Sequence, residues 1–249
     1  MIPVDKAHFE SELRRVFELN GIGNLLDEEK TQKLFELTQI MLEENEKYNL
    51  TSITDLDKII LLHYADSLIF ACELDEGKTV IDVGCGAGFP SVPLAICRPD
   101  LRITALDSTA KRVNYVKYVS DRLGLGIKTV CARAEDVARA DKSDTLREKF
   151  DYSTARAVAN LPVLCELCIP MTKIGGAFVA MKGKNGEEEL KNSQNAIKQL
   201  GATLSRTKKT SLCDGLGEAQ ERTLAVISKT QNTKKEYPRA YAQICKKPL

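Results

Sequence analysis

Short apolar runs alternate with amphipathic stretches from Lys78 onward, and this alternation constrains the fold more than any other feature of the chain. Short strands joined by amphipathic helices build a parallel sheet with helices on both faces. The expected helices cover residues 89–97, 109–123, 160–171 and 186–200. The expected strands are TVIDVG, RITALD, IKTVCA, FDYSTA, GAFVAMKG, ATLSRTKKTSL and RTLAVISK. Because no long helix separates the last two runs, we expect an α/β, Rossmann-like seven-stranded sheet whose final strand is antiparallel to its neighbour.

The amino-terminal part of the chain has a different pattern. Apolar residues recur at spacings of three and four over 9–19, 28–47 and 56–72, which is typical of amphipathic helices. Asp27 is a fair N-cap for the second of these helices. We therefore expect a helical cap over residues 1–76, an α/β domain over 77–230 and a basic tail over 231–249. The tail contains two prolines and is expected to be only partly ordered.

Charge is distributed unevenly, although the formal net charge is only +1. Residues 1–76 carry 7 basic and 17 acidic side chains, a net charge of −10, whereas residues 203–249 carry 10 and 4, a net charge of +6. An anionic partner such as RNA would therefore favour the middle and the tail of the chain over its amino-terminal part. The alternative is that these charges form ordinary solvated surfaces, and charge balance alone favours that alternative.

Composition argues against membrane and metal sites. No apolar run approaches the roughly 20 residues of a membrane span, and MIPVDKAHFE lacks the order of a signal peptide, so we expect a cytoplasmic protein. The eight cysteines show no framework of short spacings and are interpreted as reduced core thiols. Cys165 and Cys168 form one C-x-x-C pair, but a four-thiolate site needs a second pair. No metal is expected.

The stretch VIDVGCGAGFP, residues 80–90, predicts a ligand site at the end of the first strand. In an open parallel sheet, ligands bind at the carboxyl ends of the strands, where strand order reverses. A dinucleotide loop requires G-x-G-x-x-G, but the glycines here are spaced G-x-G-x-G, with Phe89 at the position of the last glycine. This variant resembles the first motif of S-adenosylmethionine-dependent methyltransferases. The residues that carry the resemblance, and that it implies as cofactor-binding, are Asp82, Gly84, Gly86, Gly88 and Phe89.

Two acidic positions support this interpretation of the loop. Asp107 closes the second strand, where a carboxylate can accept hydrogen bonds from both ribose hydroxyls. Glu135 or Asp136, in CARAED after the third strand, is placed to accept from the adenine amino group. Each acid alone is better explained as a helix cap or a solvated turn. The loop and two acids in this order favour a methyltransferase.

The sequence also limits which atom receives the methyl group. Enzymes that methylate exocyclic amino groups of bases resemble a D/N-P-P-Y signature after the fourth strand, but this chain has TARAVANL there. Methylation of a pyrimidine carbon needs a thiolate nucleophile, and Cys165 is better explained as a core residue on a helix. A ring nitrogen such as guanine N7 carries no proton, so its methylation depends mostly on positioning and desolvation.

The motifs together resemble the small-subunit ribosomal RNA N7-guanine methyltransferases, the glucose-inhibited division protein B family. The resemblance runs from about residue 45 to the end of the chain, through KYNLTSI, HYADSL, DVGCGAGFPSVPLAI, LDSTAKRVNYVKYV, CARAED, TARAVANLPVLCEL, MKGKNGEEEL and YPR…KKPL. It implies a bacterial cytoplasmic enzyme that methylates N7 of one guanosine in 16S ribosomal RNA of the small subunit. Two departures are Cys85, where Ser or Thr is usual, and Ser91, where Gly is usual.

By position, the resemblance implies S-adenosylmethionine contacts for a small set of residues, with Asp107 at the ribose. This set is Gly84, Phe89, Ala134, Glu135 and Arg156. Two rival functions stay open: methyl transfer to another substrate, and binding of S-adenosylmethionine without turnover.

The candidates for contact with RNA or the target guanine are polar residues of the same motifs. Arg133, Arg156 and Lys182 are candidates to position the guanine, and a structural ion pair is an equal alternative for each. Asn49 and His63 are expected between the cap and the sheet, and for His63 an interdomain hydrogen bond is favoured over catalysis. Arg239 of the tail either contacts RNA or folds back on the core.

Overall fold

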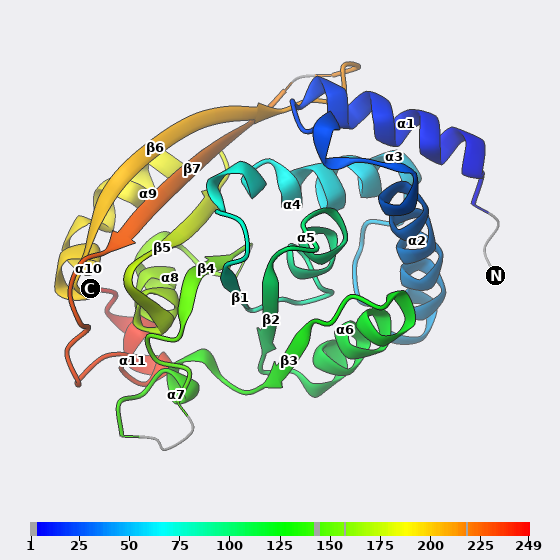
Figure 1. Ribbon diagram of the computed structural model, residues 1–249. Helices are drawn as coiled ribbons and strands as arrows, with labels where there is room; N and C mark the ends of the chain where they lie inside the picture. The colour runs from blue at the N-terminus through cyan, green and yellow to red at the C-terminus, as the bar shows by residue number, and fades with distance from the viewer. Residues whose placement is uncertain (1–3, 142–144, 157, 218) are drawn as a thin grey trace.

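The apolar runs of the second part of the chain form one mixed sheet. The computed structural model describes residues 4–141, 145–156, 158–217 and 219–249. Its sheet has seven strands in the order β3-β2-β1-β4-β5-β7-β6 (Figure 1). The strands are β1 (Thr79–Val83), β2 (Arg102–Asp107), β3 (Lys128–Cys131), β4 (Phe150–Ala155), β5 (Thr172–Lys182), β6 (Ala202–Leu212) and β7 (Gln220–Lys229). Strand β7 pairs antiparallel with β5 and β6, and the other pairings are parallel, which confirms the sequence prediction.

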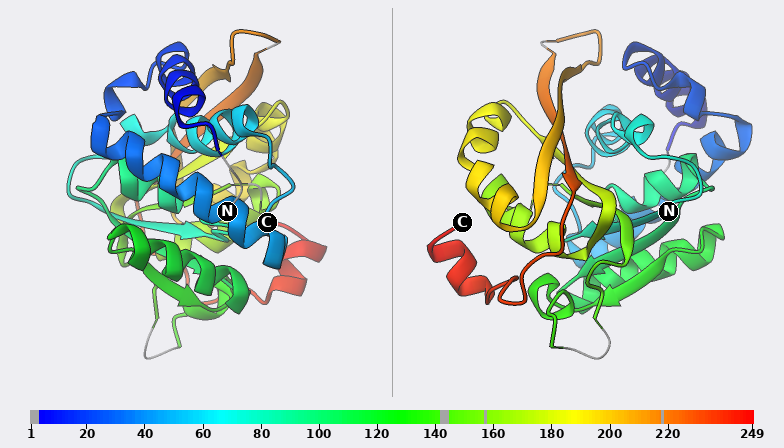
Figure 2. Two further views of the ribbon diagram at one scale, coloured as in Figure 1. Left: turned by 90° about the vertical axis from the view of Figure 1, so that its right-hand side faces the viewer. Right: turned by 60° about the vertical axis from the view of Figure 1, so that its left-hand side comes forward.

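Helices cover both faces of this sheet because alternate residues of each strand point to opposite sides. In β1, Val80 packs into one hydrophobic core and Ile81 into the other. The first core contains residues of α5 (Ser91–Cys97) and α6 (Ala110–Leu123), and the second those of α8 (Leu161–Cys168) and α10 (Gln194–Gln199). The right view of Figure 2 shows the two helical layers on either side of the sheet. Short helices α7 (Ala134–Val137), η4 (Ile169–Met171) and α9 (Gly186–Asn192) complete the connections.

The helical amino-terminal extension packs on the face that carries α5 and α6, and it shares their hydrophobic core. Its long helices are α1 (Lys6–Leu19) and α2 (Glu28–Tyr48), and Asp27 caps α2 by accepting a hydrogen bond from the Lys30 amide at 2.8 Å. The helix expected over 56–72 forms as one continuous helical run over residues 56–68, in which α3 (Leu56–Lys58) passes into the π-helical turn η2 (Ile59–Ala65) and then into α4 (Asp66–Leu68). The 3₁₀ turn η3 (Ala71–Glu73) follows this run, and the 3₁₀ turn η1 (Gly23–Leu25) joins α1 to α2.

The carboxyl-terminal tail is packed against the domain, so the expectation of partial order is corrected. Its helix α11 (Tyr241–Lys246) lies near α8 (Figure 1), and Ile244 is fully buried in the second core. The Tyr237 hydroxyl donates a hydrogen bond to the Gln199 side chain at 2.7 Å. These contacts join the tail to residues far away in the sequence. The composition of the tail alone cannot predict such contacts. Among the described residues, no helix is both long enough and apolar enough to cross a membrane.

Candidate active site

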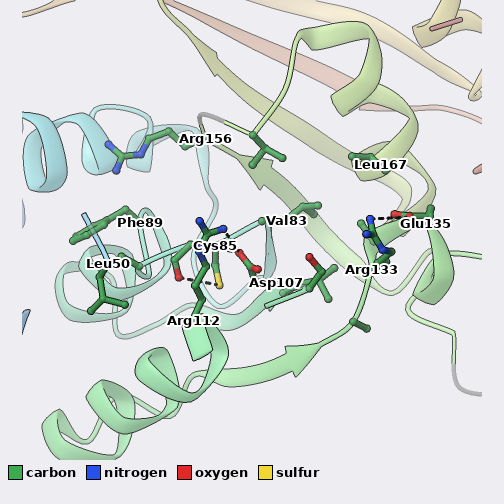
Figure 3. A pocket seen from close by; sticks show the side chains of 18 of the residues that line it. Leu50, Val83, Cys85, Phe89, Asp107, Arg112, Arg133, Glu135, Arg156 and Leu167 are labelled. Carbon is green, nitrogen blue, oxygen red and sulfur yellow. Dashed lines mark hydrogen bonds and ion pairs between the residues drawn. The ribbon is translucent and has the colours of Figure 1, made fainter. Parts of the chain in front are cut away.

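A cavity of about 440 Å³ opens at the carboxyl ends of β1, β2 and β4, where the sequence predicts the ligand site (Figure 3). The glycine loop, the end of β2, the turn after β3 and the residue after β4 all contribute to its wall. Parallel strands place these segments side by side because their carboxyl ends meet at one edge of the sheet. The lining residues named in the sequence prediction are Gly84, Gly86, Phe89, Asp107, Arg133, Ala134, Glu135, Arg156 and His63.

The glycines of the loop after β1 have different roles. All three have positive φ, which a side chain disfavours. A Cβ on Gly88 would lie 2.6 Å from Cγ2 of Val92, so this glycine permits close packing of the loop on α5 rather than lining the cavity. A Cβ on Gly86 would meet no atom closer than 4.0 Å, and this glycine does line the cavity. Gly86 thus leaves open a space that a ligand can use.

Asp82 supports the loop from below and does not line the cavity, which corrects the contact role expected for it. Its side chain is fully buried and accepts hydrogen bonds from the amide and the hydroxyl of Ser91 at the start of α5. Burial raises the pKa of Asp82 to about 6, although the bonds from Ser91 act in the opposite direction. Ser91, the residue that departs from the usual glycine, therefore has a polar partner of its own.

Two backbone amides hold the Asp107 carboxylate at the end of β2. One carboxylate oxygen accepts from the Thr109 amide at 2.8 Å, and the other accepts from the Gly86 amide at 3.0 Å. The guanidinium of Arg112, which also lines the cavity, lies 3.6 Å from the same carboxylate (Figure 3). Asp107 is only 5% exposed, so it is a preorganised acceptor at the mouth of the glycine loop.

The turn after β3 forms the opposite wall of the cavity. Glu135 is buried, and its carboxylate lies 3.7 Å from the guanidinium of Arg133 (Figure 3). That guanidinium also lies 5.6 Å from the ring centroid of Tyr241, which belongs to the tail and lines the cavity. Sequence reasoning missed Tyr241, since no motif of the tail indicates that it reaches the strand ends. Arg133 keeps 57% of its side chain exposed, so it can still contact a large ligand.

Arg156 connects the cavity to the amino-terminal helices. Its Nη1 donates to the Leu62 carbonyl at 2.6 Å and to the Asp66 carboxylate at 3.1 Å. The second oxygen of Asp66 accepts from Nε of Arg222, at the start of β7, at 2.6 Å. One carboxylate therefore neutralises two cations from different parts of the sheet. Sequence reasoning missed Arg222, because its partner lies 156 positions away.

His63 lies in the cavity wall as a neutral ring. Its imidazole stacks on Phe89 with a centroid distance of 4.2 Å and an interplanar angle of 5°. Its Nε2 lies 3.0 Å from the Thr51 hydroxyl, whereas its buried Nδ1 has no hydrogen-bond partner within the described part of the chain. Burial, with a smaller effect of the nearby Arg156 charge, lowers the pKa of His63 to about 3. His63 therefore contributes an uncharged ring to the cavity wall.

Three residues predicted to bind substrate lie outside the cavity lining. The Lys182 ammonium donates to the Ala159 carbonyl at 2.9 Å and pairs with Glu189 at 2.9 Å. Arg239 pairs with the fully buried Glu166 at 2.6 Å, so of the two roles left open for it the structure places it back on the core. Asn49 ends α2 with a left-handed backbone and is exposed, and its role stays a prediction.

The cysteines near the site are not activated. Cys165 and Cys168 are fully buried in α8, and burial raises the pKa of each thiol well above its ordinary value. A protonated, inaccessible thiol is a poor nucleophile. The core role expected for Cys165 is therefore consistent with its surroundings, and Cys85, which replaces the usual Ser or Thr, has its thiol pKa raised by burial in the same way.

Comparison with known proteins decides the family. The family model for rRNA small subunit methyltransferase G matches residues 30–214. The chain belongs to this family. A Clostridium perfringens rRNA small subunit methyltransferase G is 43% identical over 233 residues, which cover 92% of this chain and 95% of that relative. The family member from Halalkalibacterium halodurans is 41% identical over 242 residues, which cover 96% and 98% of the two chains. The family predicted from the motifs is thus confirmed.

Solved structures show the same fold at low sequence identity. A SAM-dependent methyltransferase from Methanosarcina mazei gives a TM-score of 0.51 at 14% identity and covers 66% of this chain and 98% of its own. A second, from Aquifex aeolicus, gives a TM-score of 0.50 at 17% identity over 74% and 97% of the two chains. This member of the rRNA small subunit methyltransferase G family therefore has the class I methyltransferase fold that the sequence predicts, with an amino-terminal helical extension.

Proposed function

We propose that this chain transfers the methyl group of S-adenosylmethionine to N7 of a guanosine in 16S ribosomal RNA of the small subunit. Membership of the rRNA small subunit methyltransferase G family makes ribosomal RNA the substrate. The observation that carries the proposal is the cavity at the ends of β1, β2 and β4, with the glycine loop and Asp107 in its wall. Because the proposed substrate is ribosomal RNA of the small subunit, we place the protein in the cytoplasm.

The residues of the cavity fit S-adenosylmethionine. The cavity volume, about 440 Å³, is in the range of binding sites for ligands of the size of S-adenosylmethionine. Asp107 would accept from the ribose hydroxyls, and the open space over Gly86 admits the chain between ribose and methionine. Ala134 and Glu135 would hold the adenine, and the positive charge of Arg156 lies on the other side. When bound, the cofactor supplies an electrophilic methyl group on a sulfonium.

Guanine N7 suits the chemistry of the cavity wall. Neutral guanine has an in-plane lone pair and no proton at N7, so the enzyme needs neither a general base nor a covalent nucleophile. The neutral His63 and the protonated Cys165 agree with this requirement. Catalysis then consists of holding the base in line and excluding water, to which the stacked rings of His63 and Phe89 contribute an apolar wall. Arg133, which is half-exposed, is our candidate to position the guanine.

The test is to incubate the protein with tritiated S-adenosylmethionine and small subunits that lack this modification, and then to identify the labelled nucleoside by mass spectrometry. The proposal predicts 7-methylguanosine as the main labelled nucleoside. A different methylated nucleoside would refute the N7 assignment. Cofactor binding without incorporation into subunits or free 16S RNA would instead support a binding protein without turnover.

A further inference from the structure

A second hollow lies beside the candidate active site, between α2 and α6. Helix α2 packs against α6 on the outer face of the molecule (Figure 1). The hollow has a volume of about 580 Å³ and no role in the function proposed above. Six residues line it, and we name it the tyrosine groove: Glu44, Tyr48, Lys111, Asn114, Tyr115 and Tyr118.

The tyrosine groove adjoins the cavity through two short segments. Leu50 and Arg112 line the cavity, whereas Tyr48 and Lys111 line the groove. Only Asn49 lies between Tyr48 and Leu50 in the chain, and Arg112 directly follows Lys111. A polynucleotide that presents one base to the cavity therefore has its neighbouring nucleotides close to the groove.

Two of the three rings of the groove are accessible, unlike most aromatic side chains in the described part of this protein. Tyr48 is 42% exposed and Tyr118 is 46% exposed. The Lys111 ammonium lies 5.1 Å from the ring centroid of Tyr48. Exposed aromatic faces beside a cation are the surfaces on which proteins stack unpaired bases of single-stranded RNA.

A buried polar group points to a ligand as well. Tyr115 is only 4% exposed, and its hydroxyl has no hydrogen-bond partner within the part of the chain that the structure describes. Burial raises the pKa of Tyr115, so the hydroxyl stays protonated and can donate a hydrogen bond. The exposed Asn114 amide beside it offers a base edge both a donor and an acceptor, and a small shift of Tyr115 would bring its unpartnered hydroxyl into reach.

Charge determines how a nucleotide would lie in the groove. Helix α6 carries Lys111, Arg112, Lys117 and Arg122 against one acid, Asp121. The end of α2 carries Glu43, Glu44 and Glu46 against one base, Lys47. Phosphates are therefore attracted to the α6 side and repelled from the α2 side, which leaves the base to face Tyr48.

We propose that the tyrosine groove binds an unpaired base of the RNA substrate, adjacent to the guanosine that enters the cavity. This inference rests on the proposed function, because it takes ribosomal RNA as the ligand. It adds a site for a flanking nucleotide, which selects a target guanosine by the single-stranded context around it.

The experiment measures the affinity of the full chain for unmodified small subunits by filter binding. Because one stacked base contributes about 1–3 kcal/mol, Tyr118→Ala and Tyr48→Ala are each expected to raise the dissociation constant by roughly 5- to 140-fold. Tyr118→Phe, which keeps the ring, should restore binding. Ile174→Ala is the control, since this side chain is 53% exposed near the start of β5, far from the strand ends that form the cavity.

Ultraviolet crosslinking of the wild-type protein to the subunits gives an independent readout. The proposal predicts nucleotide adducts on the peptides that contain Tyr48 or Tyr118. Unchanged affinity of both alanine variants, with thermal midpoints equal to that of the wild type and adducts only elsewhere, would overturn it. Binding and crosslinking do not depend on methyl transfer, so a failure of the proposed N7 activity would be recognised separately in the nucleoside assay.

Discussion

The replacement Asp107→Ala tests the cofactor site most sharply. In the structure this carboxylate already accepts hydrogen bonds from Gly86 and Thr109, at 3.0 and 2.8 Å, and these bonds hold it at the end of β2. Asp107 also lines the cavity, where we place the ribose of S-adenosylmethionine. A hydrogen bond to a charged group contributes about 1.5–3 kcal/mol. Asp107→Ala should therefore weaken cofactor binding roughly 12- to 140-fold.

Calorimetry with S-adenosylhomocysteine and its 2′-deoxy analogue separates ribose recognition from distortion of the loop. The wild-type protein should bind the deoxy analogue more weakly by about 1.5–3 kcal/mol. In Asp107→Ala, this difference should fall to within about 0.5 kcal/mol, because the hydroxyl has lost its partner. Asp121→Ala, which removes an exposed carboxylate of α6, is the matched control. An undiminished difference in Asp107→Ala would remove Asp107 from the ribose site.

Three further perturbations test other parts of the site. Asp66→Ala leaves the guanidinium groups of Arg156 and Arg222 without their shared carboxylate. The free energy of unfolding, measured in urea, should therefore fall by about 3 kcal/mol. A loss below about 1 kcal/mol would contradict a stabilising role of these two ion pairs. The pKa of His63 is about 3, so its NMR signals should not titrate between about pH 8 and pH 5. The buried, neutral His63 ring contributes its full stabilisation above pH 6.5, the pKa of histidine in the unfolded chain, and this contribution declines as the pH falls toward 3. A titration midpoint of His63 above about pH 5 would instead show a charged, solvated ring. Gly88→Ala should lower stability by about 1–3 kcal/mol, whereas Gly86→Ala should mainly weaken cofactor binding; equal losses of stability would refute their different roles.

Local sequence patterns were sufficient to locate the strands, although β5 begins at Thr172, four residues before the expected run. Apolar runs such as TVIDVG and RITALD became β1 and β2 within one residue of the expected ends, since buried parallel strands need continuous apolar residues. The helix expected over 186–200 divides into α9 and α10 at Ser193, whose hydroxyl donates to the Glu189 carbonyl at 2.7 Å. Hydrophobic periodicity does not detect a break of a single residue, because the apolar positions keep nearly the same spacing across it.

The candidate site was predictable where its residues follow strands and not where distant segments meet. Asp107 and Glu135 could be placed because a strand end fixes the position of the next residue. Tyr241 could not, since a tail reaches the cavity only through tertiary packing. The ion pair between Arg239 and Glu166 joins residues 73 positions apart, and no pattern in either segment names the other. Long-range pairing of this kind decides whether a basic residue is structural or available to RNA.

The central claim is that this member of the rRNA small subunit methyltransferase G family methylates N7 of one guanosine. The most direct measurement is borohydride and aniline treatment of 16S RNA, taken from unmodified small subunits after incubation with the protein and S-adenosylmethionine. This chemistry cleaves RNA at 7-methylguanosine, and cleavage is mapped by primer extension. The account predicts one discrete new cleavage, absent with Asp107→Ala at limiting cofactor concentration. Methyl incorporation without any cleavage would contradict it.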